Sequence, residues 1–172
     1  LLRIISRIMK ADSGTVTFNG NNLLSANSKH RKNMFYIGHE PSMYSFFSPY
    51  ENLKFLLKTR GLISNLRYIN EKLYYYGLIE FIDKPISVFS KGMLQKLKLA
   101  QADLINPDLL LFDEPYTGLD DDGVLLVDKL IEKIKKQNKS LIMVLHNKHK
   151  AKKYSDSILS LDSGKAIKKN AF

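Results

Sequence analysis

Two adjacent carboxylates follow an apolar segment of the sequence. Asp113 and Glu114 come directly after residues 109–112, Leu-Leu-Leu-Phe, a run typical of a buried strand. Ligands of open α/β sheets bind at the carboxyl ends of the strands. Asp113 can hold Mg²⁺, which prefers one or two carboxylates plus phosphate oxygens, and Glu114 can polarise a water for attack on a phosphate. Taken alone, the pair is also explained as an acidic strand end that begins a turn.

A serine and a glycine earlier in the chain form a candidate anion site. Ser90 precedes an amphipathic segment as an expected helix N-cap, and Gly92 lies close by. The free N–H groups and the dipole of a helix N-terminus attract phosphate. A plain cap explains Ser90 as well. His146, which follows apolar residues 141–145, is by itself an ordinary polar residue leaving a strand.

The elements that must position these residues alternate in type through the second half of the chain. We expect helices over 91–105 and 123–136, strands over 109–113, 140–145 and 157–162, and a short helix before the last strand. Continuous apolar strands separated by amphipathic helices predict a parallel sheet that is covered on both faces.

The first half of the chain contributes an edge and a helical insertion. Apolar residues in 1–9 follow a helical stripe, residues 15–20 predict a strand in an edge hairpin, and residues 35–38 predict a short buried strand. Ser48, Pro49 and Glu51 form a capping-box pattern that begins a helix ending near Arg60, and a second helix covers about 65–76. We therefore predict one α/β domain over residues 1–172, with a helical subdomain over about 44–106.

Composition excludes several classes of protein. The 172 residues are 44% hydrophobic and 26% charged, which is typical of a globular domain and not of a disordered chain. The absence of cysteine excludes disulfide scaffolds and thiolate metal sites. No apolar run approaches the ~20 residues that a membrane-spanning helix needs. The net charge of +10 is spread over short basic runs that resemble helix faces and ends, so we expect no nucleic-acid partner.

The order and spacing of these motifs resemble the ATP-binding subunit of ABC transporters over essentially the whole sequence. Residues 90–95 are similar to the family's signature loop, 110–114 to its Walker B strand and following glutamate, 118–120 to its D-loop, and His146 to its switch histidine. The resemblance implies a P-loop NTPase-like fold that binds ATP and Mg²⁺ between two such subunits.

The resemblance also implies a role for each motif residue. Asp113 would coordinate Mg²⁺, Glu114 would act as general base, and His146 would contact the γ-phosphate. Ser90 and Gly92 would reach the nucleotide from across a homodimer or heterodimer, and the D-loop would include Asp120.

Two departures from the family pattern affect these expectations. The glycine-rich phosphate loop, which in the family lies immediately before Leu1 and Leu2, is absent from the sequence, so the chain is expected to be a fragment that binds and hydrolyses ATP poorly by itself. Glu40 stands where the family has the Q-loop glutamine. Its carboxylate would touch water or Mg²⁺ while adding negative charge near the phosphates, unless it is a plain surface residue.

The segments 36–44 and 49–55 are similar to the haem-exporter ATPases of cytochrome c maturation. This implies haem export from the cytoplasmic face of the inner or plasma membrane, together with an integral membrane subunit. That subunit would dock on residues 44–47 and the helices that follow, unless those aromatics are core. Multidrug or lipid exporters, or a degenerate protein that does not hydrolyse ATP, remain the alternatives.

Overall fold

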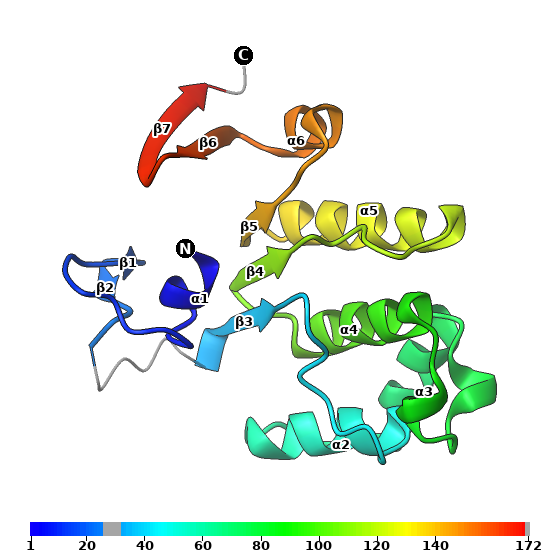
Figure 1. Ribbon diagram of the computed structural model, residues 1–172. Helices are drawn as coiled ribbons and strands as arrows, with labels where there is room; N and C mark the ends of the chain where they lie inside the picture. The colour runs from blue at the N-terminus through cyan, green and yellow to red at the C-terminus, as the bar shows by residue number, and fades with distance from the viewer. Residues whose placement is uncertain (26–31, 171–172) are drawn as a thin grey trace.

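The structure is a computed structural model that describes residues 1–25 and 32–170 (Figure 1). Its helices are α1 (Leu2–Ile5), α2 (Pro49–Thr59), α3 (Leu66–Tyr75), α4 (Lys91–Ile105), α5 (Asp121–Lys136) and α6 (Lys148–Tyr154), with single 3₁₀ turns η2 (Ile79–Phe81) and η3 (Ile86–Val88). Its strands are β1 (Thr17–Phe18), β2 (Asn21–Asn22), β3 (Met34–Ile37), β4 (Leu109–Asp113), β5 (Ser140–Val144), β6 (Ser157–Asp162) and β7 (Lys165–Asn170).

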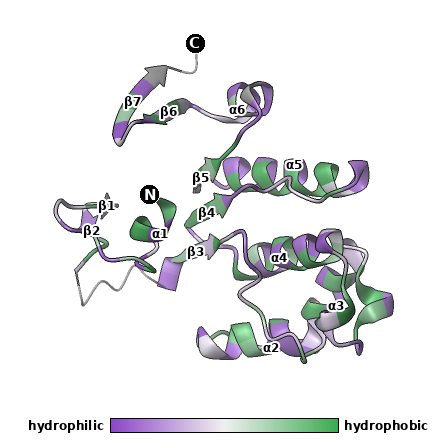
Figure 2. Ribbon diagram, in the orientation of Figure 1, coloured by the Kyte–Doolittle hydropathy of each residue, from purple (hydrophilic) through white to green (hydrophobic). Residues whose placement is uncertain are grey.

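A parallel sheet of order β3-β4-β5 lies at the centre of the molecule (Figure 1). Strand β4 pairs on both sides, and its first four residues are buried, as the apolar run predicts. Figure 2 shows β4 coloured as hydrophobic along its length. The α/β fold class and the parallel sheet are therefore confirmed.

The two faces of β4 contribute to different hydrophobic clusters. Leu110 and Phe112 join the larger cluster, which is built with helices α2 to α5. Leu109 and Leu111 point the other way and pack with Leu2 of α1, among others. This alternation is the period of two that a strand imposes, and it places helices α2 to α5 on one side of the sheet and α1 on the other.

Several helices begin where a polar cap predicts. Ser48 and Glu51 form both hydrogen bonds of a capping box, with Pro49 at the first helical position. Ser90 begins α4 by accepting from the N–H of Met93, and α4 spans the predicted residues. Helix α5 begins two residues earlier than predicted, because the Asp120 side chain accepts from the N–H of Gly123 and so caps the helix at Asp120.

The prediction that residues 157–162 join the parallel sheet is wrong. Strand β6 pairs with β7 in an antiparallel hairpin that stands apart from the central sheet (Figure 1). Asp162 pairs with Lys165, and both loop residues between them have positive φ, +48° at Ser163 and +77° at Gly164. Such a two-residue loop matches the twist of a hairpin. The basic run within 165–169, which was expected to be a helix face or end, lies in strand β7.

The prediction that helices cover both faces of the sheet is also wrong at β5. Leu141 and Met143 pack against the larger cluster, but Ile142 and Val144 are 40% and 37% exposed. Helix α1 is shorter than the stripe over 1–9 predicts, because the chain turns at Arg7, whose φ is +62°. No helix in the described ranges is both long and apolar enough to span a bilayer.

Candidate functional site

The carboxyl edge of the central sheet gathers several of the predicted residues. Ile37 of β3 pairs with Phe112 of β4, and Asp113 pairs with Val144 of β5, so the three strands end at the same level. The loops that leave them carry Glu40, Glu114 and His146 respectively. Parallel strands aligned in this way bring segments far apart in sequence to one edge.

Glu114 is held in an unusual conformation at this edge. Its φ is +51°, in the left-handed region that non-glycine residues rarely occupy. Nε2 of His146 lies 2.9 Å from Oε1 of Glu114, and Oγ1 of Thr117 donates to Oε2 at 3.1 Å. These hydrogen bonds, His146 first and Thr117 second, lower the pKa of the Glu114 carboxyl group. The structure therefore brings together Glu114 and His146 and keeps the carboxylate ionised.

Asp113 is the last residue of β4 and lies beside Tyr36 of β3. The pKa of the Tyr36 hydroxyl is raised first by burial and then by the negative charge of Asp113. Within 1–25 and 32–170, no cluster of three or more His, Asp or Glu side chains could hold a metal. A single carboxylate with phosphate oxygens suits Mg²⁺, so Asp113 fits the donor set expected for an ion bound together with a nucleotide.

The tip of α4 carries Ser90 and Gly92. The Oγ of Ser90 accepts from the N–H of Met93 at 3.2 Å, and the residue is exposed. A Cβ atom at Gly92 would lie 2.9 Å from the carbonyl oxygen of Gly118, which leaves no room for a side chain. Gly92 is therefore required by a backbone contact within the chain, in addition to any contact with a ligand.

Asp120 belongs to the same neighbourhood as the α4 tip. Its carboxylate accepts from the N–H of Gly123 at 2.8 Å and from Nζ of Lys96, on α4, at 3.3 Å. The hydrogen bond from Gly123, followed by that from Lys96, lowers the pKa of Asp120. The structure thus groups Asp120 with Ser90 and Gly92 through helix α4.

Glu40 is exposed and has no hydrogen bond or ion pair among the residues that the structure describes. The residues before it are held by Lys98 of α4, whose Nζ donates to the carbonyl oxygens of Gly38 and His39. The structure does not bring Glu40 into contact with Glu114 or His146.

Four residues that support the site were not found from the sequence. Thr117 bonds Glu114, and Lys98 holds the loop before Glu40. Gln95 donates to the carbonyl oxygen of Pro115, and the hydroxyl of Tyr116 donates to Asp128 of α5 at 2.7 Å. The sequence signal is weak in each case. Gln95 and Lys98 are polar residues on the buried face of an amphipathic helix, and this is the one sequence feature that could have identified them.

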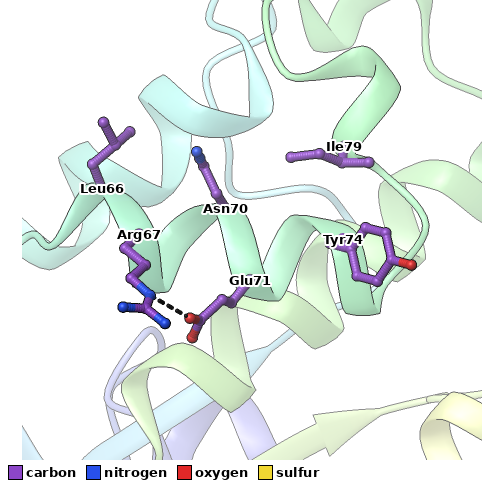
Figure 3. A pocket seen from close by; sticks show the side chains of 6 residues that line it. All are labelled: Leu66, Arg67, Asn70, Glu71, Tyr74 and Ile79. Atoms are coloured by element: carbon purple, nitrogen blue, oxygen red, sulfur yellow. Dashed lines mark hydrogen bonds and ion pairs between the residues drawn. The ribbon is translucent and has the colours of Figure 1, made fainter.

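A hollow on the surface lies away from these residues. It has a volume of about 570 Å³ and is lined by Leu66, Arg67, Asn70, Glu71, Tyr74 and Ile79 (Figure 3). An exposed ion pair between Arg67 and Glu71 lies along it at 3.0 Å. None of the predicted site residues lines this hollow.

Solved structures share this arrangement of strands and helices. The structure of an ATP-binding subunit of an ABC transporter superposes with a TM-score of 0.86 at 25% identity, over 98% of this chain and 72% of that one. A dimeric, post-hydrolysis ATP-binding cassette bound to ADP and Pi superposes with a TM-score of 0.85 at 21% identity, over 99% and 79%. The fold is that of an ATP-binding cassette.

Sequence comparison leads to the same class. The family profile described as ABC transporter matches residues 1–117, and the chain belongs to this family. It is 28% identical to the ABC transporter ATP-binding protein NatA of Bacillus subtilis over 99% of this chain and 71% of that protein. It is 32% identical to the cytochrome c biogenesis ATP-binding export protein CcmA of Yersinia pseudotuberculosis, over 72% and 56%. The chain thus spans about half to three quarters of the length of these relatives.

Proposed function

We propose that the chain is part of an ATP-hydrolysing subunit of an ABC exporter. The observation that carries this proposal is the contact between Glu114 and His146 at the carboxyl edge of the sheet, 2.9 Å between Oε1 and Nε2. The ionised carboxylate suits a general base that orients and deprotonates the attacking water. The backbone of Glu114 is strained as well, which is typical of residues placed for chemistry.

ATP and Mg²⁺ are the proposed substrate and cofactor. Asp113 would hold the ion, since it ends β4 beside the general base. When bound, Mg²⁺ neutralises charge on the phosphate oxygens. In the proposed site His146 contacts the γ-phosphate and Glu40 lies toward the water or the ion.

A second ATP-binding subunit would complete the site. Ser90 is exposed at the N-terminus of a helix of fifteen residues, α4, whose dipole and N–H groups suit a phosphate presented by another molecule. Ser90 makes no contact with Glu114 or His146 among the described residues and faces solvent, which suits a site divided between two subunits.

The proposed membrane partner docks on the aromatic segment 44–47. Tyr44 and Phe47 pack with Phe55 of α2, with ring centroids 5.1 and 5.0 Å from Tyr44. The alternative that these rings are core does not fit Phe46, which is 88% exposed. An exposed aromatic cluster is typical of an interaction surface. Docking of an integral membrane subunit here would place the chain at the cytoplasmic face of the membrane.

The decisive substitution is Glu114→Gln in the full-length gene product. We expect MgATP binding to remain and steady-state hydrolysis to fall by about a hundredfold or more, because the general base is lost while the binding groups stay. A nucleotide-bound dimer should accumulate in size-exclusion chromatography. Glu80→Gln, an exposed change on η2, is the matched control. Normal turnover by Glu114→Gln would remove Glu114 from its role.

Ser90→Arg tests the divided site. We expect it to abolish hydrolysis and dimer formation while the monomer keeps its affinity for MgATP, because the arginine blocks only the surface offered to the partner. A loss of nucleotide affinity in the monomer would contradict the arrangement.

The proposed transport role is haem export in cytochrome c maturation. It is supported by the 32% identity to CcmA, whose name gives it as a cytochrome c biogenesis export protein. Deleting the gene should abolish covalent haem in c-type cytochromes, measured by haem staining of membrane proteins. Unchanged staining would favour a multidrug or lipid exporter.

A further inference from the structure

Lys98 is a buried amine for which the proposed reaction has no use. It lies in the middle of α4 and is 6% exposed. Its Nζ donates to two backbone carbonyl oxygens, that of Gly38 at 3.0 Å and that of His39 at 2.6 Å. Both carbonyls lie just past the end of β3, so one side chain fixes the start of the loop that carries Glu40.

Burial of an ammonium group is costly unless its charge is balanced. Burial lowers the pKa of Lys98, and among the residues that the structure describes the negative charge of Glu40 opposes this effect. No ion pair of Lys98 occurs among the described residues, and its partners are carbonyl dipoles. Glu40 directly follows His39, whose carbonyl oxygen accepts from Nζ of Lys98, so the chain itself brings the Glu40 carboxylate near the buried ammonium group.

The charge of Lys98 also affects Glu40. Glu40 leaves the carboxyl edge of the sheet, where the proposed nucleotide phosphates would lie, and a carboxylate there repels them. A positive charge fixed directly behind the loop reduces this repulsion.

We propose that Lys98 is a positioning residue that anchors the 38–40 loop to helix α4 and compensates the charge of Glu40 at the nucleotide site. The anchoring follows from the two hydrogen bonds alone. The charge compensation rests on the proposed function, because it requires an anionic ligand at the sheet edge.

The test of anchoring uses Lys98→Met, which keeps the length of the side chain and removes the donors. In the full-length gene product without nucleotide, amide hydrogen exchange of residues 38–40 should become about tenfold faster, because the loop loses the two hydrogen bonds that hold it against α4 and opens more often. Lys98→Arg should restore most of the protection, and Lys58→Met, an exposed change on α2, should leave it unchanged. Unchanged exchange in Lys98→Met would overturn the anchoring.

The test of charge compensation is the salt dependence of MgATP binding. Lys98→Met should weaken binding by about fivefold at low ionic strength, a Coulombic effect across a partly solvated site, and Glu40→Gln should strengthen it by a similar factor. At about 1 M salt both effects should fall below about twofold, because salt screens charges at an accessible site. A lysine needed only for folding would weaken binding by the same factor at both salt concentrations, and that result would overturn the compensation.

The exchange measurement and the MgATP-binding measurement test this inference and the proposed function separately. If the unmodified protein bound no MgATP, the proposed function would fail and with it the compensation. The exchange measurement would still decide whether Lys98 anchors the loop. If Lys98→Met unfolded the protein, Lys98→Gln would replace it in both measurements, since it removes the charge and shortens the reach to the two carbonyls. Faster exchange and weaker MgATP binding in the folded variant would then support the charged anchor, and exchange and binding like those of the unmodified protein would contradict it.

Discussion

Helix α4 is held differently at its two ends. Near its C-terminal end, the Asp103 carboxylate is 5% exposed and accepts from Lys72 of α3 at 2.6 Å and from Lys133 of α5. At its N-terminal end, Ser90 is exposed and the helix is tied to the loop after β4 by contacts of Gly92, Gln95 and Lys96. The first end joins three helices through the buried carboxylate of Asp103, whereas the second joins the helix to the loop that carries Glu114.

The comparison separates the groups that stabilise the fold from the groups proposed to do chemistry. Burial raises the pKa of Asp103, but the hydrogen bonds from Lys133 and Lys72 more than offset this, so the net pKa is lowered. The Asp103 carboxylate is also the second cause, after burial, of a raised pKa at Tyr76. The Glu114 carboxylate has a lowered pKa too, but at an accessible edge where its partner His146 is exposed.

The largest expected effect on stability belongs to Asp103→Asn. Removing one partner of a buried ion cluster leaves two ammonium groups uncompensated, which costs about 3 kcal/mol in the free energy of unfolding. This lies at the low end of such losses, because Lys72 and Lys133 remain 16% and 36% exposed and can be hydrated. Urea denaturation followed by circular dichroism measures the change. Glu71→Gln, which breaks the exposed pair with Arg67, should cost less than about 0.5 kcal/mol.

The same cluster gives a pH dependence with a definite sign. Because the folded pKa of Asp103 lies below its ordinary value of 3.8, its stabilisation is complete above that value and is lost as the pH falls through the lowered folded pKa. The difference in unfolding free energy between the unmodified protein and Asp103→Asn should therefore be constant from neutral pH down to about pH 5 and shrink below it. A difference that grew on acidification would contradict the assignment.

The C-terminal end of α4 and the elements near it show how much of the fold can be predicted from the sequence. The bounds of α4 and β4 were predicted correctly, because a polar cap and an uninterrupted apolar run are local signals. The hairpin of β6 and β7 was missed, although Ser163 and Gly164 are typical turn residues, because the alternation of β6 was interpreted as a continuous run.

The candidate site likewise contains contacts that the sequence predicted and contacts that it did not. Glu114 and His146 were named from motif order, and the structure places them in contact. Lys98 and Tyr116 act across sixty and twelve residues of sequence respectively, on a backbone carbonyl and on Asp128. No local pattern encodes such contacts, since they exist only once the sheet and helices have packed.

The next largest effect is expected at the N-terminal end of α4, for Gly92→Ala. Alanine is favoured over glycine inside a helix by up to about 1 kcal/mol. The new Cβ would, however, lie 2.9 Å from the carbonyl oxygen of Gly118, and such overpacking costs about 1–3 kcal/mol. We expect a net loss of about 1.5 kcal/mol in the free energy of unfolding, because the cost of the clash exceeds the gain in helix propensity. Lys91→Ala is the matched control on the same turn. A rise in stability for Gly92→Ala would show that the backbone at the N-terminus of α4 shifts to accommodate the new methyl group.

A smaller effect than that of Gly92→Ala is expected for Tyr116→Phe. It removes the hydroxyl that donates to Asp128 at 2.7 Å but keeps the ring, over which Nζ of Lys150 lies 3.3 Å from the centroid. The loss should be about 1 kcal/mol, because Asp128 keeps Lys153 at 3.7 Å. If the hydroxyl acts through Asp128, Tyr116→Phe combined with Asp128→Asn should cost less than the sum of the two single changes in urea denaturation. Additive losses would mean that Tyr116 is held by its ring alone, and that the loop carrying Glu114 is joined to α6 through Lys150 and not to α5.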